Sequence, residues 1–245
     1  MRALAFTRRC FKELLRDPLT LIFGIAFPVV LLLMLSIMNR NIPAEAVDLF
    51  QIEKLLPGIV VFGFSFLSLF GGLLLAGDRD TAFLTRLFTS PLRAHEFLIG
   101  YAIPLMPVGL AQALISTLIA FAFGLEATPR ILLMLLFLLP CMLFFILLGL
   151  LLGSLLSSKQ VGSISGALLT NLSAWLSGTW FSLDLMGKGF KHVAFCLPFA
   201  NAVEAARIAL SGALDEIWKP FLILCAWTVG VAAVAIPVFH RKMRA

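Results

Sequence analysis

Long apolar stretches alternate with short polar ones along this chain, and six of them are long enough to cross a bilayer. A hydrocarbon core about 30 Å thick requires roughly 20 apolar residues in a helix. We place the six spans at 19–38, 55–77, 97–124, 131–156, 161–182 and 220–239. Pro104 and Pro107 are expected to kink the third span. The pattern predicts an all-α integral membrane protein with six transmembrane helices in one domain, residues 1–245.

Residues 1–17 have the pattern of an amphipathic helix rather than of a span. Its two sides are clearly separated, with Ala3, Leu4, Phe6, Cys10, Phe11, Leu14 and Leu15 on one half and Arg2, Arg8, Arg9, Lys12, Glu13 and Arg16 on the other. Such a helix lies in the plane of the lipid headgroups. Pro18 then breaks the chain direction before the first span.

Residues 78–96 form a short charged segment with helical periodicity between the second and third spans. Asp78 or Asp80 is suited to cap its start, and Pro91 ends it. Its apolar side consists of Phe83, Leu84, Leu87 and Phe88. Two interpretations are open at this point: the apolar side rests on the membrane surface, or it docks onto another protein.

The segment 183–219 contains apolar pieces that are too short to cross the membrane. We expect two short helices on or in the outer leaflet, before the last span. For the second of these, Asn201 is the expected cap, Glu204 completes a capping box, and Gly212 follows the end.

Composition agrees with the membrane assignment, because 61% of the 245 residues are hydrophobic and 13% are charged, against about 25% in soluble domains. With both termini inside, the inner segments carry a net charge of +7 and the outer segments −1, which matches the overall +6. The positive-inside rule therefore places the termini and residues 78–96 in the cytoplasm. A multi-pass protein of the bacterial cytoplasmic (inner) membrane is expected, and the basic charge needs no nucleic-acid partner.

The candidate chemistry is sparse, and no catalytic residue is predicted. The three histidines fall at or beyond the ends of spans, and the four scattered cysteines are interpreted as small apolar residues, so no metal site is predicted. Gly187 and Lys188 are followed by Gly189 and lack the glycine-rich loop of an ATP site. Energy for uphill transport would have to come from another chain.

The predicted spans hold no charged residue near the membrane midplane, unlike proton-coupled or sodium-coupled carriers. Their strongest polar side chains are Gln112 and Asn171, which either bond between helices or contact a cargo. Gly149 and Gly153 have the spacing of a close helix contact. A path lined by such residues suits a lipophilic or amphipathic cargo.

The chain resembles, over nearly its whole length, the type-2 permeases of ATP-binding-cassette exporters. The family commonly has an acidic-Arg-acidic cluster between its second and third spans, followed by a Gly-Thr step, a Leu and a small residue before Pro-Leu. The matching residues here are Asp78-Arg79-Asp80, Leu87 and Ser90-Pro91-Leu92, together with Pro198 and Arg207 in the outer segment. Ala82 and Phe83 replace the Gly-Thr step, and Ser182 stands where proline is common.

The resemblance implies a complex of several chains. Two copies of an ABC ATPase, which would bind ATP and Mg, are expected beneath a permease homodimer or a pair with a similar permease, within membrane lipid; this chain itself needs no cofactor. Coupling to the ATPase would involve Asp78, Arg79, Asp80, Phe83, Leu84, Leu87, Phe88 and Pro91. The translocation pathway would run along the second and fifth spans, with candidates Phe62, Phe64, Phe66, Phe70, Gln112 and Asn171. Each of these phenylalanines could instead face lipid or another helix.

The leading hypothesis is the permease subunit of an exporter of a drug, an antibiotic or a lipid-like compound, such as a multidrug-efflux system. Export of a polysaccharide or glycolipid is a related alternative, although one Tyr and four Trp are few for an aromatic-lined sugar channel. A passive channel or a membrane scaffold without an ATPase is an alternative from a different class.

Overall fold

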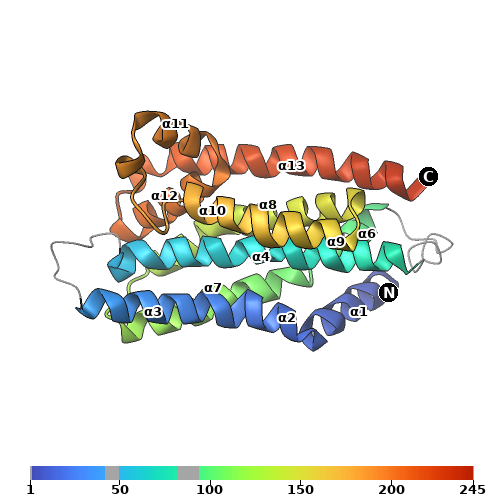
Figure 1. Cartoon of the computed structure of the whole chain (residues 1–245), viewed down its shortest axis with the longest axis horizontal. Coiled ribbons are helices and arrows are strands. Elements are labelled where there is room, and N and C mark those ends of the chain that lie inside the picture. Colours follow the sequence, from blue (N-terminus) through green and yellow to red (C-terminus); the bar gives the residue numbers. More distant parts are fainter. Residues whose placement is uncertain (1, 42–49, 82–93, 245) are drawn as a thin grey trace.

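A computed structural model describes residues 2–41, 50–81 and 94–244 (Figure 1). All the regular elements in these ranges are helices, and the long ones run side by side along the longest axis. They are α1 (Arg2–Arg16), α2 (Pro18–Leu21), η1 (Ile22–Ala26), α3 (Phe27–Asn41), α4 (Ile52–Asp80), α6 (Ala94–Ala102), α7 (Leu105–Ala122), α8 (Arg130–Leu155), α9 (Ser158–Val161), η3 (Gly162–Leu169), α10 (Thr170–Leu176), η4 (Leu183–Met186), α11 (Lys188–Cys196), α12 (Pro198–Ser211), η5 (Leu214–Glu216) and α13 (Trp218–Arg244). We call the end with both termini the terminal end, and the other the α11 end.

Five helical stretches are long and apolar enough to cross a membrane: Pro18–Asn41, Ile52–Asp80, Glu96–Ala122, Arg130–Leu155 and Leu214–Arg241. Five of the six predicted spans are thereby confirmed, and the protein is an all-α, multi-pass integral membrane protein. The third stretch is broken where α6 ends and α7 begins, beside Pro104, so the predicted kink is confirmed there.

The remaining predicted span, 161–182, has to be corrected in its bounds and in its apolar character. The chain is helical from Ser158 to Leu176 through α9, η3 and α10, six residues short of the predicted end, and this stretch is not among those apolar enough to qualify. It nevertheless lies along α4 (Figure 1). Its eight-residue π-helix, η3, is wider than an α-helix, a feature that often marks functional positions.

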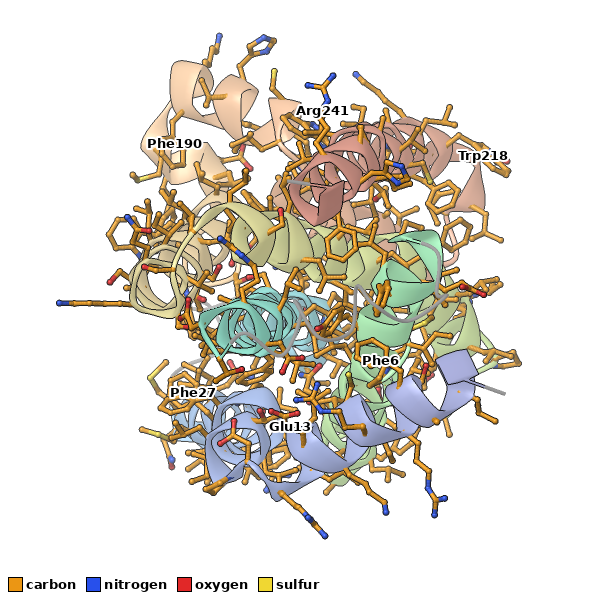
Figure 2. The ribbon with its side chains drawn as sticks, turned by 90° about the vertical axis from the view of Figure 1, so that its right-hand side faces the viewer. Phe6, Glu13, Phe27, Phe190, Trp218 and Arg241 are labelled. Atoms are coloured by element: carbon orange, nitrogen blue, oxygen red, sulfur yellow. The ribbon has the colours of Figure 1, made fainter. Side chains whose placement is uncertain are left out.

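Helix α4 lies at the centre of the bundle (Figure 2). Its most apolar 18-residue window is 89% buried, compared with 44% for α8 and 11% for the α13 stretch. With 29 residues, α4 is about 43 Å long at 1.5 Å per residue, so it extends beyond a hydrocarbon core about 30 Å thick. At least one end of α4 therefore extends beyond the hydrocarbon.

Helices α4 and α8 approach each other at backbone distance. A Cβ atom added to Gly149 would lie 2.3 Å from the Ser68 carbonyl oxygen, and one added to Gly153 would lie 2.5 Å from the Gly72 carbonyl oxygen. Only glycine fits at such a separation. The predicted close contact at Gly149 and Gly153 is confirmed, and its partner is the central helix.

Two helices, α11 and α12, occupy the predicted outer segment and meet at a bend of 89°. The predicted cap at Asn201 is wrong, because α12 begins at Pro198, which starts a helix well since its nitrogen has no hydrogen to leave unpaired. Asn201 instead donates from its amide to the carbonyl oxygens of Phe195 and Leu197 and holds the bend. Gly212 does end α12, with a left-handed φ of 86°.

Candidate functional site

Asp78, Arg79 and Asp80 form the last turn of α4. They were predicted to begin a separate helix that Asp78 or Asp80 would cap, and this is wrong for Asp78, whose carboxylate binds side chains of other helices. Successive residues in an α-helix point about 100° apart. Three adjacent side chains can therefore contact three different neighbours, and these three do.

Asp78 is the buried member of the group, with 4% of its surface exposed. Both of its oxygens accept hydrogen bonds from the guanidinium of Arg9 on α1, each at 2.6 Å. The hydroxyl of Tyr101 on α6 donates to the same carboxylate at 2.8 Å. A buried charge requires such pairing. This cluster joins the amphipathic helix to the central helix and to α6.

Helix α1 reaches Asp78 because its inner stripe packs on protein. Phe6, Cys10 and Leu14 are buried, and the ring of Phe6 meets that of Tyr101 edge-on at 4.9 Å. Figure 2, which views the bundle from the terminal end, shows α1 crossing this end with Phe6 turned towards α6. The predicted helix at 1–17 is confirmed. Its inner stripe covers protein, while Leu4 remains 74% exposed.

The surroundings of Asp78 shift the protonation equilibria of α1. The hydrogen bonds to Asp78 raise the pKa of Arg9 above its ordinary value, so the guanidinium stays charged. Burial raises the pKa of Cys10 to about 12. Burial also raises the pKa of Glu13, against the opposing effect of Arg9, to which Glu13 is paired at 2.9 Å.

Arg79 and Asp80 connect α4 to the next two helices. Arg79 donates to the carbonyl oxygens of Gly153 and Leu156, where α8 ends and its own backbone leaves acceptors unpaired. Asp80 accepts a hydrogen bond of 2.7 Å from the hydroxyl of Ser158 at the start of α9. The end of α4 is thus bonded to α1, α6, α8 and α9. We call Arg9, Asp78, Arg79, Asp80, Tyr101 and Ser158 the terminal cluster.

The other predicted coupling residues lie outside the described residues. These are Phe83, Leu84, Leu87, Phe88 and Pro91, together with Ala82, where the family pattern fails. The cluster sits where the chain leaves α4 towards them, and α6 begins at Ala94, where the described chain resumes. The amphipathic docking helix therefore stays a prediction. The two helices between which the segment 82–93 lies, α4 and α6, are joined by the hydrogen bond from Tyr101 to Asp78.

The phenylalanines proposed for the pathway gather in one aromatic row. Phe62, Phe66 and Phe70 follow each other along α4, with ring centroids 5.4 Å and 6.4 Å apart. Phe23 and Phe27 cover this row from the first span and are each more than a third exposed. Phe64 is also buried. In a single chain these rings fill the seam between two helices.

Gln112 and Asn171, the two polar residues proposed for the pathway, differ in burial. Gln112 on α7 is 1% exposed and lies against Gly63 of α4; its amide nitrogen donates to Ser116, while its oxygen has no partner in the described part of the chain. Asn171 on α10 is exposed and donates to the carbonyl oxygen of Ala167. Their helices, α7 and α10, lie on different sides of α4, so the structure does not bring the two residues together (Figure 1).

Sequence reasoning missed Arg9 and Tyr101 as functional candidates. Arg9 was assigned to the charged half of the amphipathic helix together with the other cations. Tyr101 is the single tyrosine of the chain and the fifth residue of the predicted third span. A lone phenol in such a position would have been the signal, because a buried hydroxyl needs a partner.

The bundle defines a polytopic α-helical membrane protein whose central span is tied to an amphipathic surface helix. A family model described as "ABC-2 type transporter" matches residues 2–211, and the chain belongs to this family. It is also similar to ycf38 of Cyanophora paradoxa, which its name provisionally describes as a transport permease. The two are 27% identical over 212 residues, covering 83% of this chain and 72% of the relative. The chain is accordingly a membrane permease of the ABC-2 type.

Proposed function

We propose that the chain is the permease subunit of an ATP-driven exporter of a lipophilic or amphipathic compound, and that a separate ATPase docks at the terminal end. The observation that carries the proposal is the terminal cluster. A movement of residues 82–93 would displace α4 and α6, to which this segment is directly connected. The hydrogen bonds of Asp78, Arg79 and Asp80 would transmit the displacement to α1, α8 and α9. A helix end bonded in this way moves with its neighbours.

The composition of the spans supports the proposed cargo class. The five stretches that can cross the hydrocarbon are predominantly apolar. The aromatic row on α4, together with Phe23 and Phe27, could contact a lipophilic molecule when a neighbouring chain or a helix movement separates α4 from the first span. A second permease copy is the expected neighbour, with two ATPase copies beneath the pair. Export of a polysaccharide or glycolipid is the second candidate, and competition between sugars and lipophilic dyes for transport would separate the two.

Changing Leu87 and Phe88 to Asp is expected to abolish binding of the ATPase, because charged side chains cannot be covered by an apolar docking surface. The measurement is ATP hydrolysis that co-purifies with the affinity-tagged chain from its native membrane. Leu185→Asp is the matched control, since Leu185 is 82% exposed at the α11 end and should leave the hydrolysis unchanged. Equal hydrolysis in all three preparations would count against the proposed docking site.

Labelling of cysteines tests the proposed orientation, in which the termini are cytoplasmic. Cys196 is exposed at the α11 end, whereas Cys10 is buried with a pKa of about 12 and holds little thiolate at neutral pH. A membrane-impermeant maleimide should label intact cells at Cys196 and lose this signal in Cys196→Ser. Labelling of Cys196 only after permeabilisation would reverse the orientation.

A further inference from the structure

A cavity of about 510 Å³ lies at the α11 end between α11, α12 and the start of α13. Its volume is within the range of about 300–1,000 Å³ that small-molecule sites usually have. Its wall combines apolar side chains, among them Phe195, Ile208 and Ile223, with charged groups of both signs. The terminal cluster is at the opposite end of the bundle, so this cavity is a separate feature.

The charged groups of the cavity are Glu204 from α12, Glu216 from η5 and Lys219 from α13. Within the described residues none of them forms a hydrogen bond or an ion pair. Arg207 attracts Glu204 electrostatically, but its Nε and Nη2 donate to the backbone carbonyls of Lys54 and Gly178. Glu204 is half-buried, and a carboxylate removed from water favours a cation as its partner.

The frame of the cavity is held by hydrogen bonds. The amide of Asn201, which is 1% exposed, bonds the backbone at the bend between α11 and α12. The indole of Trp227 on α13 donates to the carbonyl oxygen of Cys196, the last residue of α11. These bonds fix α12 and α13 relative to the end of α11. The cavity is therefore a formed feature of the fold and does not depend on a ligand to assemble it.

The cavity lies beside an exposed apolar surface of α13. Trp218 and Leu222, on the same part of α13, are 59% and 61% exposed. Tryptophan is enriched where the hydrocarbon meets the headgroups, so this part of α13 has the character of that boundary. A ligand held here would have its polar part among the charges and its apolar part beside α13. The arrangement matches a membrane lipid better than a water-soluble solute.

We propose that this cavity binds the headgroup of a phospholipid carrying a primary ammonium and a phosphate, of the phosphatidylethanolamine type. The ammonium donates hydrogen bonds to Glu204 and Glu216, and Lys219 pairs with the phosphate. A metal ion is a poorer occupant, since no group of three His, Cys, Asp or Glu side chains in the described part of the chain is placed to hold one. The proposal is independent of the ATPase and of the cargo.

The test is the retention of lipid by the purified full-length chain, measured by native mass spectrometry after exchange into lipid-detergent micelles of stated composition. Phosphatidylethanolamine should be retained best. Phosphatidylcholine lacks the N–H donors and phosphatidylglycerol lacks the ammonium, so each should be retained about tenfold less, as expected for the loss of hydrogen bonds to a charged group.

Variants locate the binding in the cavity. Glu204→Gln with Glu216→Gln should lower retention of phosphatidylethanolamine about tenfold and remove the preference over phosphatidylglycerol. Asp215→Asn, an exposed acidic neighbour of Glu216 that does not line the cavity, should behave as the wild type. Lys219→Gln should weaken all three phospholipids together, which serves as a second test if the double variant does not fold. Equal retention of the three lipids by the wild type, or an unchanged preference in the double variant, would overturn the proposal.

Discussion

Replacing Gly149 by alanine is expected to destabilise the bundle by about 3 kcal/mol, at the upper end of the usual cost of overpacking. The added Cβ would lie 2.3 Å from the carbonyl oxygen and 2.5 Å from the Cα of Ser68. Both are backbone atoms of the most buried helix, so no side chain can rotate away to make room. Helices α4 and α8 would have to move apart along their whole contact.

The measurement is the midpoint of thermal or denaturant-induced unfolding in detergent micelles. Gly230→Ala is the matched control, because a Cβ at Gly230 on α13 would meet nothing within 4 Å and alanine is the better helix former by roughly 0.5–1 kcal/mol. The account therefore predicts opposite signs for the same chemical change at two positions. A Gly149→Ala variant as stable as the wild type would mean that α4 and α8 are not in backbone contact.

Neutralising Asp78 is expected to cost about 3 kcal/mol, the lower end of the range for breaking a buried ion pair, since the Arg9 side chain is still 36% exposed to solvent. Asp78→Asn removes the charge that both guanidinium bonds need and leaves the shape nearly unchanged. Unfolding of the single variants Asp78→Asn and Arg9→Met and of the double variant would give the coupling energy directly.

The double variant should be less destabilised than the sum of the two single variants by about 1–3 kcal/mol, because each single change already removes the shared interaction. Asp80→Asn is the control, since its carboxylate is exposed and bonds a serine hydroxyl; its cost should stay below about 1 kcal/mol. Additive effects of the two changes would show that α1 is not held to α4 through this pair.

Hydropathy was sufficient to find the helices but not to rank their burial. The α8 stretch has the highest mean hydropathy, 3.1, yet 44% of its window is buried, while α4 has 2.3 and is 89% buried. In a bilayer an apolar side chain is equally stable against lipid and against protein, so hydropathy does not separate the two. The better signal is small residues: α4 carries Gly63, Gly71 and Gly72 where other helices approach closely.

Polar and small residues explain why the predicted fifth span was the least accurate. Ser163, Ser165, Gly166 and Asn171 dilute the apolar pattern, and the regular helix ends at Leu176, before the turn at Gly178 with its φ of 69°. The prediction extended the span to Ser182, through Trp180 and Phe181. Trp180 in fact packs against Phe62 of α4 from that turn.

Tertiary partners lay beyond the reach of sequence reasoning. The cluster Asp78-Arg79-Asp80 was identified by resemblance, but Arg9 lies 69 residues away from Asp78 in the chain and Gly153 lies 74 away from Arg79. Such pairings follow from how helices pack, which periodicity does not encode. Their effect is to make the acidic-Arg-acidic cluster a junction of α4 with four other helices, an interpretation that its charge alone did not suggest.

The most direct test of the proposed function is ATP-driven movement of a lipophilic fluorescent dye in inverted membrane vesicles that contain the chain and its co-purifying ATPase. The account predicts accumulation of dye inside the vesicles that requires ATP and is lost when Leu87 and Phe88 are changed to Asp, but not with Leu185→Asp. Dye or ion flux through the purified chain alone, equal with and without ATP, would contradict it and identify a passive channel.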